Sequence, residues 1–284
     1  MIKKNLPSCS IIIVTFNSQK HLSKAMECLQ QQTHPIAKII IVDTGSEDTA
    51  YLQLYQHQPN VEVVIAEKNS GFCKGNNIGF SKLPVNSDYV FFLNPDAFIN
   101  AAFVRYAIAF LQSPQNQHYG AATGTVLGYN IDTDQPSGSY DTTGVFRKWY
   151  GKWYDRGQGQ TYNPGLFIVQ EDLDAICGAV FFCRKKALDS VMLQNNEVFD
   201  NTFYMYKEDI DLSLRLRRKG WKLTFLPQLM AHHCRGWQKN RALMPRELRL
   251  CSAKNELRVH LKTFAPIPVV YSLCKYAAVK WLNM

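Results

Sequence analysis

The first hundred residues alternate short apolar runs with amphipathic segments. Four runs are dominated by β-branched and aromatic residues with little polar alternation, at residues 8–16, 38–43, 61–66 and 88–94. This pattern is typical of strands that are buried on both faces. Between the first two runs, Leu22, Met26 and Leu29 recur at helical spacing. Alternating strands and helices predict a parallel sheet that is covered by helices.

The rest of the chain has a less regular pattern. Residues 129–173 are rich in glycine and aromatic residues without a clear period, and we expect a long functional loop there. Beyond this segment we predict a buried strand and three helices, at residues 175–183, 208–220, 242–262 and 269–282. Pro266 and Pro268 separate the last two helices. The pattern therefore predicts an α/β domain followed by a helical C-terminal extension.

The charge is concentrated near the C-terminus. The 284 residues are 46% hydrophobic and 19% charged, with a formal net charge of +9, which excludes collagen-like, disordered and polytopic membrane proteins. Residues 235–284 contain ten basic and two acidic residues, whereas residues 1–234 contain 22 and 21. This excess fits either an interfacial helix over 269–282 that contacts anionic lipid, or a helix packed on the domain with a solvated basic face. Because no nucleic-acid-binding motif accompanies it, we expect no nucleic-acid partner.

Cysteine usage indicates the compartment. The eight cysteines are scattered and include no CxxC pair, so they match neither a disulfide framework nor a zinc site. No apolar run reaches the length of about 20 residues that a membrane-spanning helix needs. Both observations favour a reducing, cytoplasmic location.

Polar residues follow three of the predicted strands. They are Thr15 and Asn17 after the first, Asp43 after the second, and Asn94 and Asp96 after the fourth. In parallel sheets, ligands bind at the carboxyl ends of the strands. A carboxylate such as that of Asp96 can hold Mg²⁺ or Mn²⁺, which in turn binds a diphosphate. Taken alone, the segment that begins at Asp43 favours a turn and helix cap over a ligand site.

A glycine- and asparagine-rich segment, NSGFCKGNNIG, occupies residues 69–79. Glycines allow a backbone to approach a ligand closely, and asparagine amides can bond a nucleobase or a phosphate. The segment lacks the spacing and position of the dinucleotide-binding fingerprint. A tight loop followed by a helix cap explains it equally well.

An acidic cluster begins the predicted helix at 208–220. The positive end of a helix dipole stabilises carboxylates there, and Asp211 can pair with Arg215 one turn later. Glu208 and Asp209 are more than a helix start requires, so one of them is a candidate general base.

Two adjacent histidines, His232 and His233, follow an apolar segment. An imidazole could ligate a metal beside the carboxylates. Because no other ligand lies nearby in the sequence, these residues alone favour a packed or surface pair.

Taken in order, these motifs resemble the inverting glycosyltransferases of family 2, and most closely their rhamnosyltransferase-like branch. The segments that carry the resemblance are VTFN (14–17), VDTGSED (42–48), NSGFCKGNN (69–77), LNPDAF (93–98), DRGQGQ (155–160), CGAVFFCRK (177–185), FYMYKEDIDLSLRLRRKGW (203–221) and HHCRG (232–236). They cover roughly residues 8–237. Asn94 stands where most such families carry the first of two carboxylates, a departure common in this branch.

The resemblance implies a GT-A fold with a mostly parallel central sheet, a nucleotide-diphosphate-sugar donor and Mg²⁺ or Mn²⁺ as cofactor. Asp209 would be the catalytic base, with Glu208 beside it. Asp96 and His233 would bind the metal, with His232 as the fallback. The donor would contact Thr15, Asn17, Asp43, Asn69, Gly71, Lys74, Asn77 and Asp96.

The implied activity is transfer of a sugar, for which rhamnose from dTDP-rhamnose is the best match, to a glycan or lipid-linked glycan in cell-surface polysaccharide synthesis. The GT-A domain would span residues 1–237, with a nucleotide-sugar half at 1–100 and an acceptor and catalytic half at 101–237. Residues 238–284 would form a basic helical extension. Peripheral contact of residues 235–284 with the inner face of the cell membrane would bring a lipid-linked acceptor within reach.

Two alternatives stay open. A non-catalytic nucleotide-sugar or glycan-binding protein could use the same scaffold, although the presence of Glu208, Asp209 and His233 favours an enzyme. A nucleotidyltransferase should carry a glycine-rich loop with arginine after the first strand, where this chain has TFNSQKHL.

Overall fold

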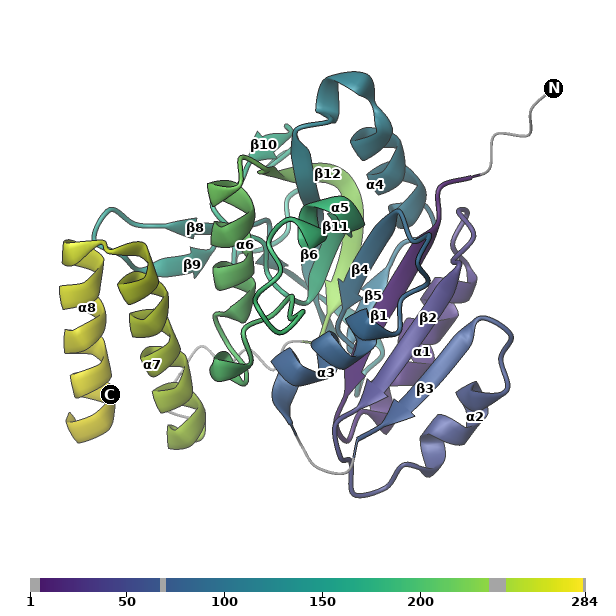
Figure 1. Cartoon of the computed structure of the whole chain (residues 1–284), viewed down its shortest axis with the longest axis horizontal. Coiled ribbons are helices and arrows are strands. Elements are labelled where there is room, and N and C mark those ends of the chain that lie inside the picture. The colour runs from purple at the N-terminus through teal and green to yellow at the C-terminus, as the bar shows by residue number, and fades with distance from the viewer. Residues whose placement is uncertain (1–5, 67–69, 235–243, 283–284) are drawn as a thin grey trace.

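A computed structural model describes residues 6–66, 70–234 and 244–282 and shows a layered α/β molecule (Figure 1). The elements of its first half are β1 (Cys9–Thr15), α1 (Gln19–Gln30), β2 (Lys38–Asp43), α2 (Gln53–Gln56), β3 (Val61–Ile65), α3 (Gly71–Ser81) and β4 (Tyr89–Leu93). These strands coincide with the four predicted apolar runs. The α/β class is therefore confirmed.

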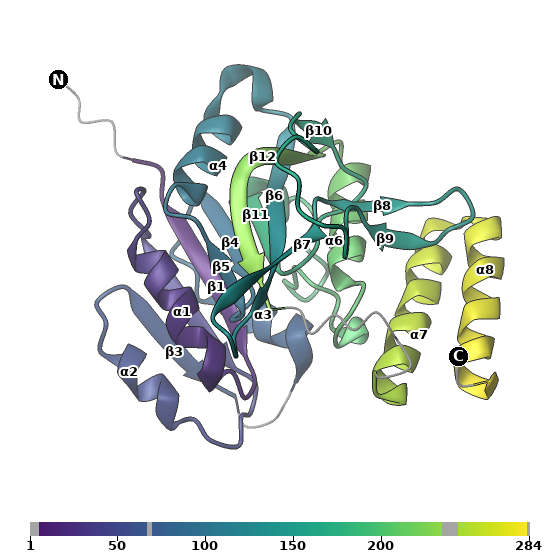
Figure 2. The same ribbon diagram turned by 180° about the vertical axis from the view of Figure 1, so that it is seen from behind.

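The first four strands form the parallel part of the sheet, in the order β3-β2-β1-β4. Ile12, Ile40 and Phe92 are fully buried, because α1 and α3 cover opposite faces of this part of the sheet (Figures 1 and 2). The register sets Thr15 opposite Asp43. The carboxyl ends of the strands therefore meet at one edge, as a parallel sheet requires.

The second half extends the sheet with β5 (Ala97–Ile99), β6 (Tyr119–Asn130), β11 (Val180–Arg184) and β12 (Lys222–His233), beside which α4 (Phe103–Gln112) and α5 (Lys185–Asp189) pack. β11 lies antiparallel between β4 and β6, and β12 runs parallel to β6 but antiparallel to β5. The sheet is thus parallel over the first hundred residues and mixed beyond them. β11 runs in the opposite direction to its two neighbours, and antiparallel neighbours need no helical crossover.

The prediction of a long loop over residues 129–173 is wrong. This segment contains β7 (Gln135–Thr142), β8 (Val145–Arg147), β9 (Trp153–Asp155) and β10 (Glu171–Asp172). β7 pairs with β6, β8 with β9, and β10 with β12. The strands are short or largely exposed, so no apolar period marks them. Their partners in the tertiary structure, rather than their own pattern, make them strands.

The predicted C-terminal helices are present with shifted ends, as α6 (Glu208–Arg218), α7 (Arg246–Thr263), α8 (Pro266–Ala277) and a final π-helical turn (Ala278–Leu282). Pro266 begins α8, because proline is tolerated in a first helical turn. α7 and α8 lie side by side at one flank, next to the β8–β9 hairpin (Figures 1 and 2). The expected domain boundary at residue 237 falls outside the described residues. Within the described ranges, no helix combines the length and the apolar character needed to cross a membrane.

A buried hydrogen-bond chain joins the β8–β9 hairpin to both terminal helices. Trp153 Nε1 donates to His260 Nε2 at 3.1 Å, and His260 Nδ1 lies 2.6 Å from Ser272 Oγ. An indole can only donate, so Nδ1 carries the ring proton and donates to the serine. Burial lowers the pKa of His260 to about 4, which keeps the ring neutral. The hairpin, α7 and α8 are thus fixed to one another.

Candidate active site

Two cavities meet at the carboxyl end of β4. The smaller, about 380 Å³, lies at the ends of β1 and β4 and beside the start of α3. The larger, about 1000 Å³, lies between α6, the β8–β9 hairpin and α8. Both are lined by Phe72, Asn94, Asp96 and Met205. One ligand could therefore lie in each cavity, with their reacting ends near Asp96.

The smaller cavity collects four of the predicted donor residues: Thr15, Asn17, Gly71 and Asp96. Asn17 follows β1 with a φ of 50°, which turns the chain away from the sheet edge. Gly71 begins α3 with a φ of +80°, and a Cβ there would lie 2.4 Å from the ring of Tyr204. Only glycine fits this close approach.

Asp43 lies next to this cavity but does not line it. The residue is fully buried, and its carboxylate accepts hydrogen bonds from Thr15 Oγ1 (2.9 Å), the Ser46 amide (2.8 Å) and Tyr51 Oη (3.1 Å). Burial acts in the opposite direction, but these donors, led by Ser46, lower the pKa of Asp43. In this structure Asp43 holds the ends of β1 and β2 together.

Three other predicted donor residues also lie away from the cavities or outside the described structure. Asn77 accepts from the amides of Val198 and Phe199, at 2.9 Å each, so its side chain anchors the segment before α6. Lys74 is exposed on α3, away from the residues that line either cavity. Asn69 lies outside the described residues.

Asp96 and His233 come together at the junction of the cavities. The pairing of β12 with β5 sets His233 opposite Ala97, which brings His233 Nε2 to 3.3 Å from Asp96 Oδ1. His233 Nδ1 lies 2.9 Å from Asp141 Oδ2. Burial opposes the charged ring, yet the carboxylates of Asp96 and Asp141 raise the pKa of His233 to about 9.

His232, the alternative metal ligand, is oriented differently. Its ring packs edge-on against Tyr129, with centroids 5.7 Å apart. Neighbouring residues of a strand point to opposite faces, so only His233 lies beside Asp96.

The residues at this junction fit a divalent cation that shares its coordination with a substrate. Among the described residues, no group of three or more His, Cys, Asp or Glu side chains is arranged to hold a metal ion. Mg²⁺ and Mn²⁺, however, commonly take one or two protein ligands and complete their shell with substrate phosphates and water. Asp96 and His233 supply a carboxylate and an imidazole, and Asp141 orients the ring as second-shell carboxylates do.

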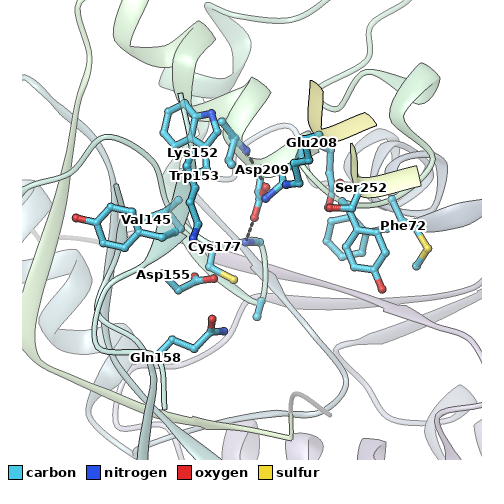
Figure 3. A pocket seen from close by; sticks show the side chains of 18 of the residues that line it. Phe72, Val145, Lys152, Trp153, Asp155, Gln158, Cys177, Glu208, Asp209 and Ser252 are labelled. Carbon is cyan, nitrogen blue, oxygen red and sulfur yellow. Dashed lines mark hydrogen bonds between the residues drawn. The ribbon is translucent and has the colours of Figure 1, made fainter. Parts of the chain in front are cut away.

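Asp209 projects into the larger cavity from the first turn of α6 (Figure 3). Its Oδ2 accepts from the Gly178 amide at 2.9 Å, and its Oδ1 accepts from the Ile210 amide at 2.8 Å. Burial raises the pKa of Asp209, while these two amides act against the shift. The carboxylate is therefore fixed in position and basic enough to take a proton.

Glu208 lies beside it with a different environment. It is 7% exposed, and no described residue bonds its Oε2. Burial, followed by the neighbouring Asp209 carboxylate, raises the pKa of Glu208 from 4.5 to about 8. Of the two acids, Glu208 therefore holds a proton at neutral pH, and Asp209, with its two amide donors, is the ionised one.

A strained segment leads into these acids and is held by α7. Tyr204, Tyr206 and Lys207 have φ angles of 63°, 67° and 71°, a region that costs non-glycine residues about 1–2 kcal/mol each. Asn255 Nδ2 donates to the carbonyl oxygens of Phe203 (2.8 Å), Met205 (2.9 Å) and Tyr206 (3.0 Å). The C-terminal extension thus fixes the segment that carries Glu208 and Asp209.

Several residues of the larger cavity were missed by the sequence interpretation. They are Lys152, Trp153, Asp155 and Gln158 on the β8–β9 hairpin and its continuation; and Ser252, Tyr271, Cys274 and Lys275 on α7 and α8. Asp141, near the end of β7, does not line the cavity but contacts His233, and it was missed as well. Figure 3 shows Asp155 and Gln158 on one side of the cavity, and Glu208 and Ser252 on the other. The DRGQGQ stretch was the available signal for Asp155 and Gln158. Asp141 and the α8 residues carried no such signal.

The comparisons with known proteins agree with this arrangement. Residues 10–191 match the family model "Glycosyl transferase family 2". A relative from Mycobacterium tuberculosis, N-acetylglucosaminyl-diphospho-decaprenol L-rhamnosyltransferase, is 23% identical in an alignment of 238 positions that covers 78% of this chain and 75% of the relative. Rhamnosyltransferase WbbL from Escherichia coli K12 is 27% identical, over 78% of this chain and 82% of the relative.

Solved structures support the fold. The crystal structure of GalNAc-T7 with UDP, GalNAc and Mn²⁺ superposes with a TM-score of 0.67 at 16% identity. The match covers 91% of this chain, which spans about half (48%) of that chain. This likeness confirms the GT-A fold, and the match of the family model over more than half of the sequence shows that the chain belongs to glycosyl transferase family 2.

Proposed function

We propose that this glycosyltransferase transfers rhamnose from dTDP-rhamnose, with inversion, to a glycan or lipid-linked glycan acceptor in cell-surface polysaccharide synthesis. The names of the relatives from M. tuberculosis and E. coli support rhamnose as the sugar. The observation that carries the chemistry is the position of Asp209: a partly buried carboxylate, fixed by two amides, in a cavity that meets a second cavity at Asp96.

In this proposal the two substrates occupy the two cavities. The nucleoside lies in the smaller cavity near Thr15 and Asn17, and its diphosphate lies at Asp96. The acceptor lies in the larger cavity, between Asp209 and Asp155. The anomeric carbon of the donor sugar is then near the junction of the two.

The reaction is a single displacement at that carbon. Asp209 takes the proton of an acceptor hydroxyl, whose oxygen forms a bond to the anomeric carbon from the face opposite the diphosphate. The bond from that carbon to the diphosphate oxygen breaks, and the nucleoside diphosphate leaves with the bonding electrons. Attack from the opposite face inverts the configuration. Glu208 keeps its proton and leaves Asp209 as the base.

Asp96 and His233 would hold Mg²⁺ or Mn²⁺, which when bound neutralises the charge of the diphosphate. Asp141 keeps the His233 ring in position. The β8–β9 hairpin, with buried Trp153, forms one wall of the larger cavity. That wall helps to exclude water, which would otherwise hydrolyse the donor.

The experiment is a binding panel followed by product analysis. Nucleotide sugars are tested for thermal stabilisation of the full chain with Mg²⁺ or Mn²⁺, and the donors that bind are then incubated with glycan and lipid-linked acceptors. We expect dTDP-rhamnose to give the largest shift and an inverted product. Stabilisation by a donor with no transfer to any acceptor would favour a non-catalytic binding protein.

Asp209→Asn tests the base directly. We expect turnover to fall by about 10²–10⁴-fold, because proton removal is lost, while the thermal shift with donor stays at the wild-type value. The exposed Asp48→Asn serves as the matched control. Turnover near the wild-type rate in Asp209→Asn would overturn the assignment.

The proposal also includes a cytoplasmic location with peripheral membrane contact through residues 235–284. Its support is the lipid acceptor in the name of the M. tuberculosis relative and the basic excess of this segment. The contact itself is developed below.

A further inference from the structure

The outer side of α8 exposes a row of large apolar side chains. Ile267, Val270 and Leu273 are 55%, 60% and 49% exposed, and their spacing of three residues sets them along one face of the helix. Phe264 before the helix and Trp281 after it are 91% and 73% exposed. α8 lies at the outer edge of the molecule (Figure 1), so this row faces away from the domain.

The turn of the β8–β9 hairpin, residues 147–152, adds a second exposed element. Its sequence RKWYGK presents Trp149, which is 81% exposed, together with exposed Arg147, Lys148 and Lys152. The rings of Tyr150 and Tyr271 lie 5.2 Å apart, which ties the turn to α8.

Backbone contact keeps these two elements together. Gly151 has a φ of 114°, and a Cβ there would lie 2.7 Å from Pro268 Cα. The buried hydrogen-bond chain from Trp153 through His260 to Ser272 also joins the hairpin to α8. The hairpin turn and the apolar row of α8 therefore form one surface, which we name the docking face.

The segments that form the docking face carry charge of one sign, and Asp174, whose Oδ2 accepts from the Arg147 amide, adjoins them. Residues 145–152 and 257–284 contain no Asp or Glu, whereas Arg147, Lys148 and Lys280 are exposed there. Lys280 lies over the ring of Trp281, 5.5 Å from its centroid. Tryptophan, tyrosine and lysine beside exposed aliphatic groups are the composition of surfaces that lie in the headgroup region of a bilayer.

The side of α8 next to the apolar row lines the larger cavity. Tyr271, Cys274 and Lys275 contribute to that wall, and Cys274 is also exposed to solvent. The cavity therefore borders the apolar row along α8. An acceptor whose anchor lies in a membrane could present its glycan to Asp209 across this helix.

We propose that the docking face, formed by the hairpin turn 147–152 and the apolar row of α8, binds the surface of an anionic lipid bilayer and orients the larger cavity toward it. This inference rests on the proposed function in one respect only: a membrane-anchored acceptor is the reason why the enzyme would contact a membrane. The binding itself is a property of the docking face and can be measured without donor or acceptor.

The test is sedimentation of the full chain with vesicles of phosphatidylcholine, alone or mixed with phosphatidylglycerol. We expect binding to the mixed vesicles that weakens with salt. Val270→Glu, which introduces a negative charge into the apolar row, is expected to reduce partitioning of the protein onto the mixed vesicles by more than about tenfold. Lys148→Gln is expected to reduce it by about fivefold, the effect of one basic residue near an anionic surface.

The control is Val85→Glu, at a 99% exposed valine in the connection between α3 and β4. It should bind vesicles as the wild type does. Equal sedimentation of Val85→Glu and Val270→Glu, or no binding of the wild type to anionic vesicles, would overturn the proposal. A wild-type dimer that Val270→Glu converts to a monomer would also overturn it, by assigning the face to a second copy.

Donor binding separates this inference from the proposed function. If Val270→Glu loses vesicle binding but keeps the thermal shift with donor, the docking face is supported independently of the substrate. If no nucleotide sugar binds but the protein still binds anionic vesicles, the proposed function is refuted while the docking face is supported.

Discussion

The local environments of Glu208 and Asp209 differ although the two residues are adjacent in sequence. Asp209 accepts from two backbone amides, whereas the Oε2 atom of Glu208 is buried without a described hydrogen-bond partner. Amide donors stabilise a carboxylate, and burial without donors stabilises the acid. In the first turn of α6, Asp209 is therefore the ionised carboxylate and Glu208 is the protonated one.

The retained proton makes stability depend on pH. Because the pKa of Glu208 rises from 4.5 to about 8 on folding, the folded protein keeps a proton that the unfolded chain releases. The free energy of unfolding therefore falls as pH rises between these values. Glu208→Gln has no such proton, so we expect its stability relative to wild type to improve by the order of a few kcal/mol from about pH 5 to about pH 9.

Denaturant unfolding at several pH values measures this difference. The exposed Glu247→Gln, in the first turn of α7, is the matched control and should show no such trend. A pH-independent difference between Glu208→Gln and the wild type would contradict the proposed protonation of Glu208.

The metal assignment gives a second prediction for single residues. Chelation with EDTA should abolish the thermal shift with donor and the turnover, and added Mg²⁺ or Mn²⁺ should restore both. Asp141→Asn should weaken the apparent metal affinity by about 10–100-fold, because Asp141 orients His233. The exposed Asp132→Asn on the neighbouring β6–β7 connection is the control. Full activity in EDTA would refute the roles proposed for Asp96 and His233.

Helix α7 acts through the segment it holds. Asn255 bonds three carbonyl groups of residues 203–206, and Lys262 pairs with Asp200 (2.6 Å) and Asp211 (2.7 Å) on either side of that segment. Asp211 also pairs with Arg215, as predicted. These contacts offset the cost of the left-handed residues before α6. The helix therefore supports the position of Asp209 through the segment that precedes α6.

Asn255→Ala is the test at this scale. Loss of three hydrogen bonds at a buried site should lower the free energy of unfolding by about 1–3 kcal/mol. We also expect kcat to fall more than donor binding, because Asp209 loses its fixed position. Lys254→Ala, at the exposed neighbour on the same helix, should change neither quantity. An Asn255→Ala enzyme with lowered stability but unchanged kcat would show that the clamp serves folding alone.

In the whole molecule, the basic C-terminal extension lines the larger cavity of the candidate active site. α7 fixes the segment that leads to Asp209, and α8 lines the larger cavity and exposes the apolar row on the adjoining side. Some of its basic groups are structural, as in the ion pair of Lys275 with buried Glu256. The remaining exposed charge is shared with the hairpin turn 147–152. The proposed boundary at residue 237 therefore divides the chain in sequence, whereas the larger cavity is lined by residues from both sides of that boundary.

Much of the first half could be predicted because its information is local. Runs such as KIIIVD identify buried strands by their own composition, and strand ends in a parallel sheet gather at one edge. Thr15, Asn17 and Asp96 accordingly lie where the pattern indicated. The family resemblance also included Asp43 and Asn77, but their side chains are taken up by hydrogen bonds within the protein.

The amino-acid sequence by itself determined the family, the α/β class, the parallel strands and the two acids at the start of α6, because each depends on residues close together in the chain. The tertiary structure decided that residues 129–173 form strands, that Asp141 supports His233, and that α8 forms a wall of the larger cavity. The strands depend on their pairing partners in β6, β9 and β12. The support of His233 and the position of the terminal helices depend on partners more than ninety residues apart, such as Asp141 and His233 or Trp153 and His260. A local pattern carries no record of such contacts, since they exist only once the chain has folded.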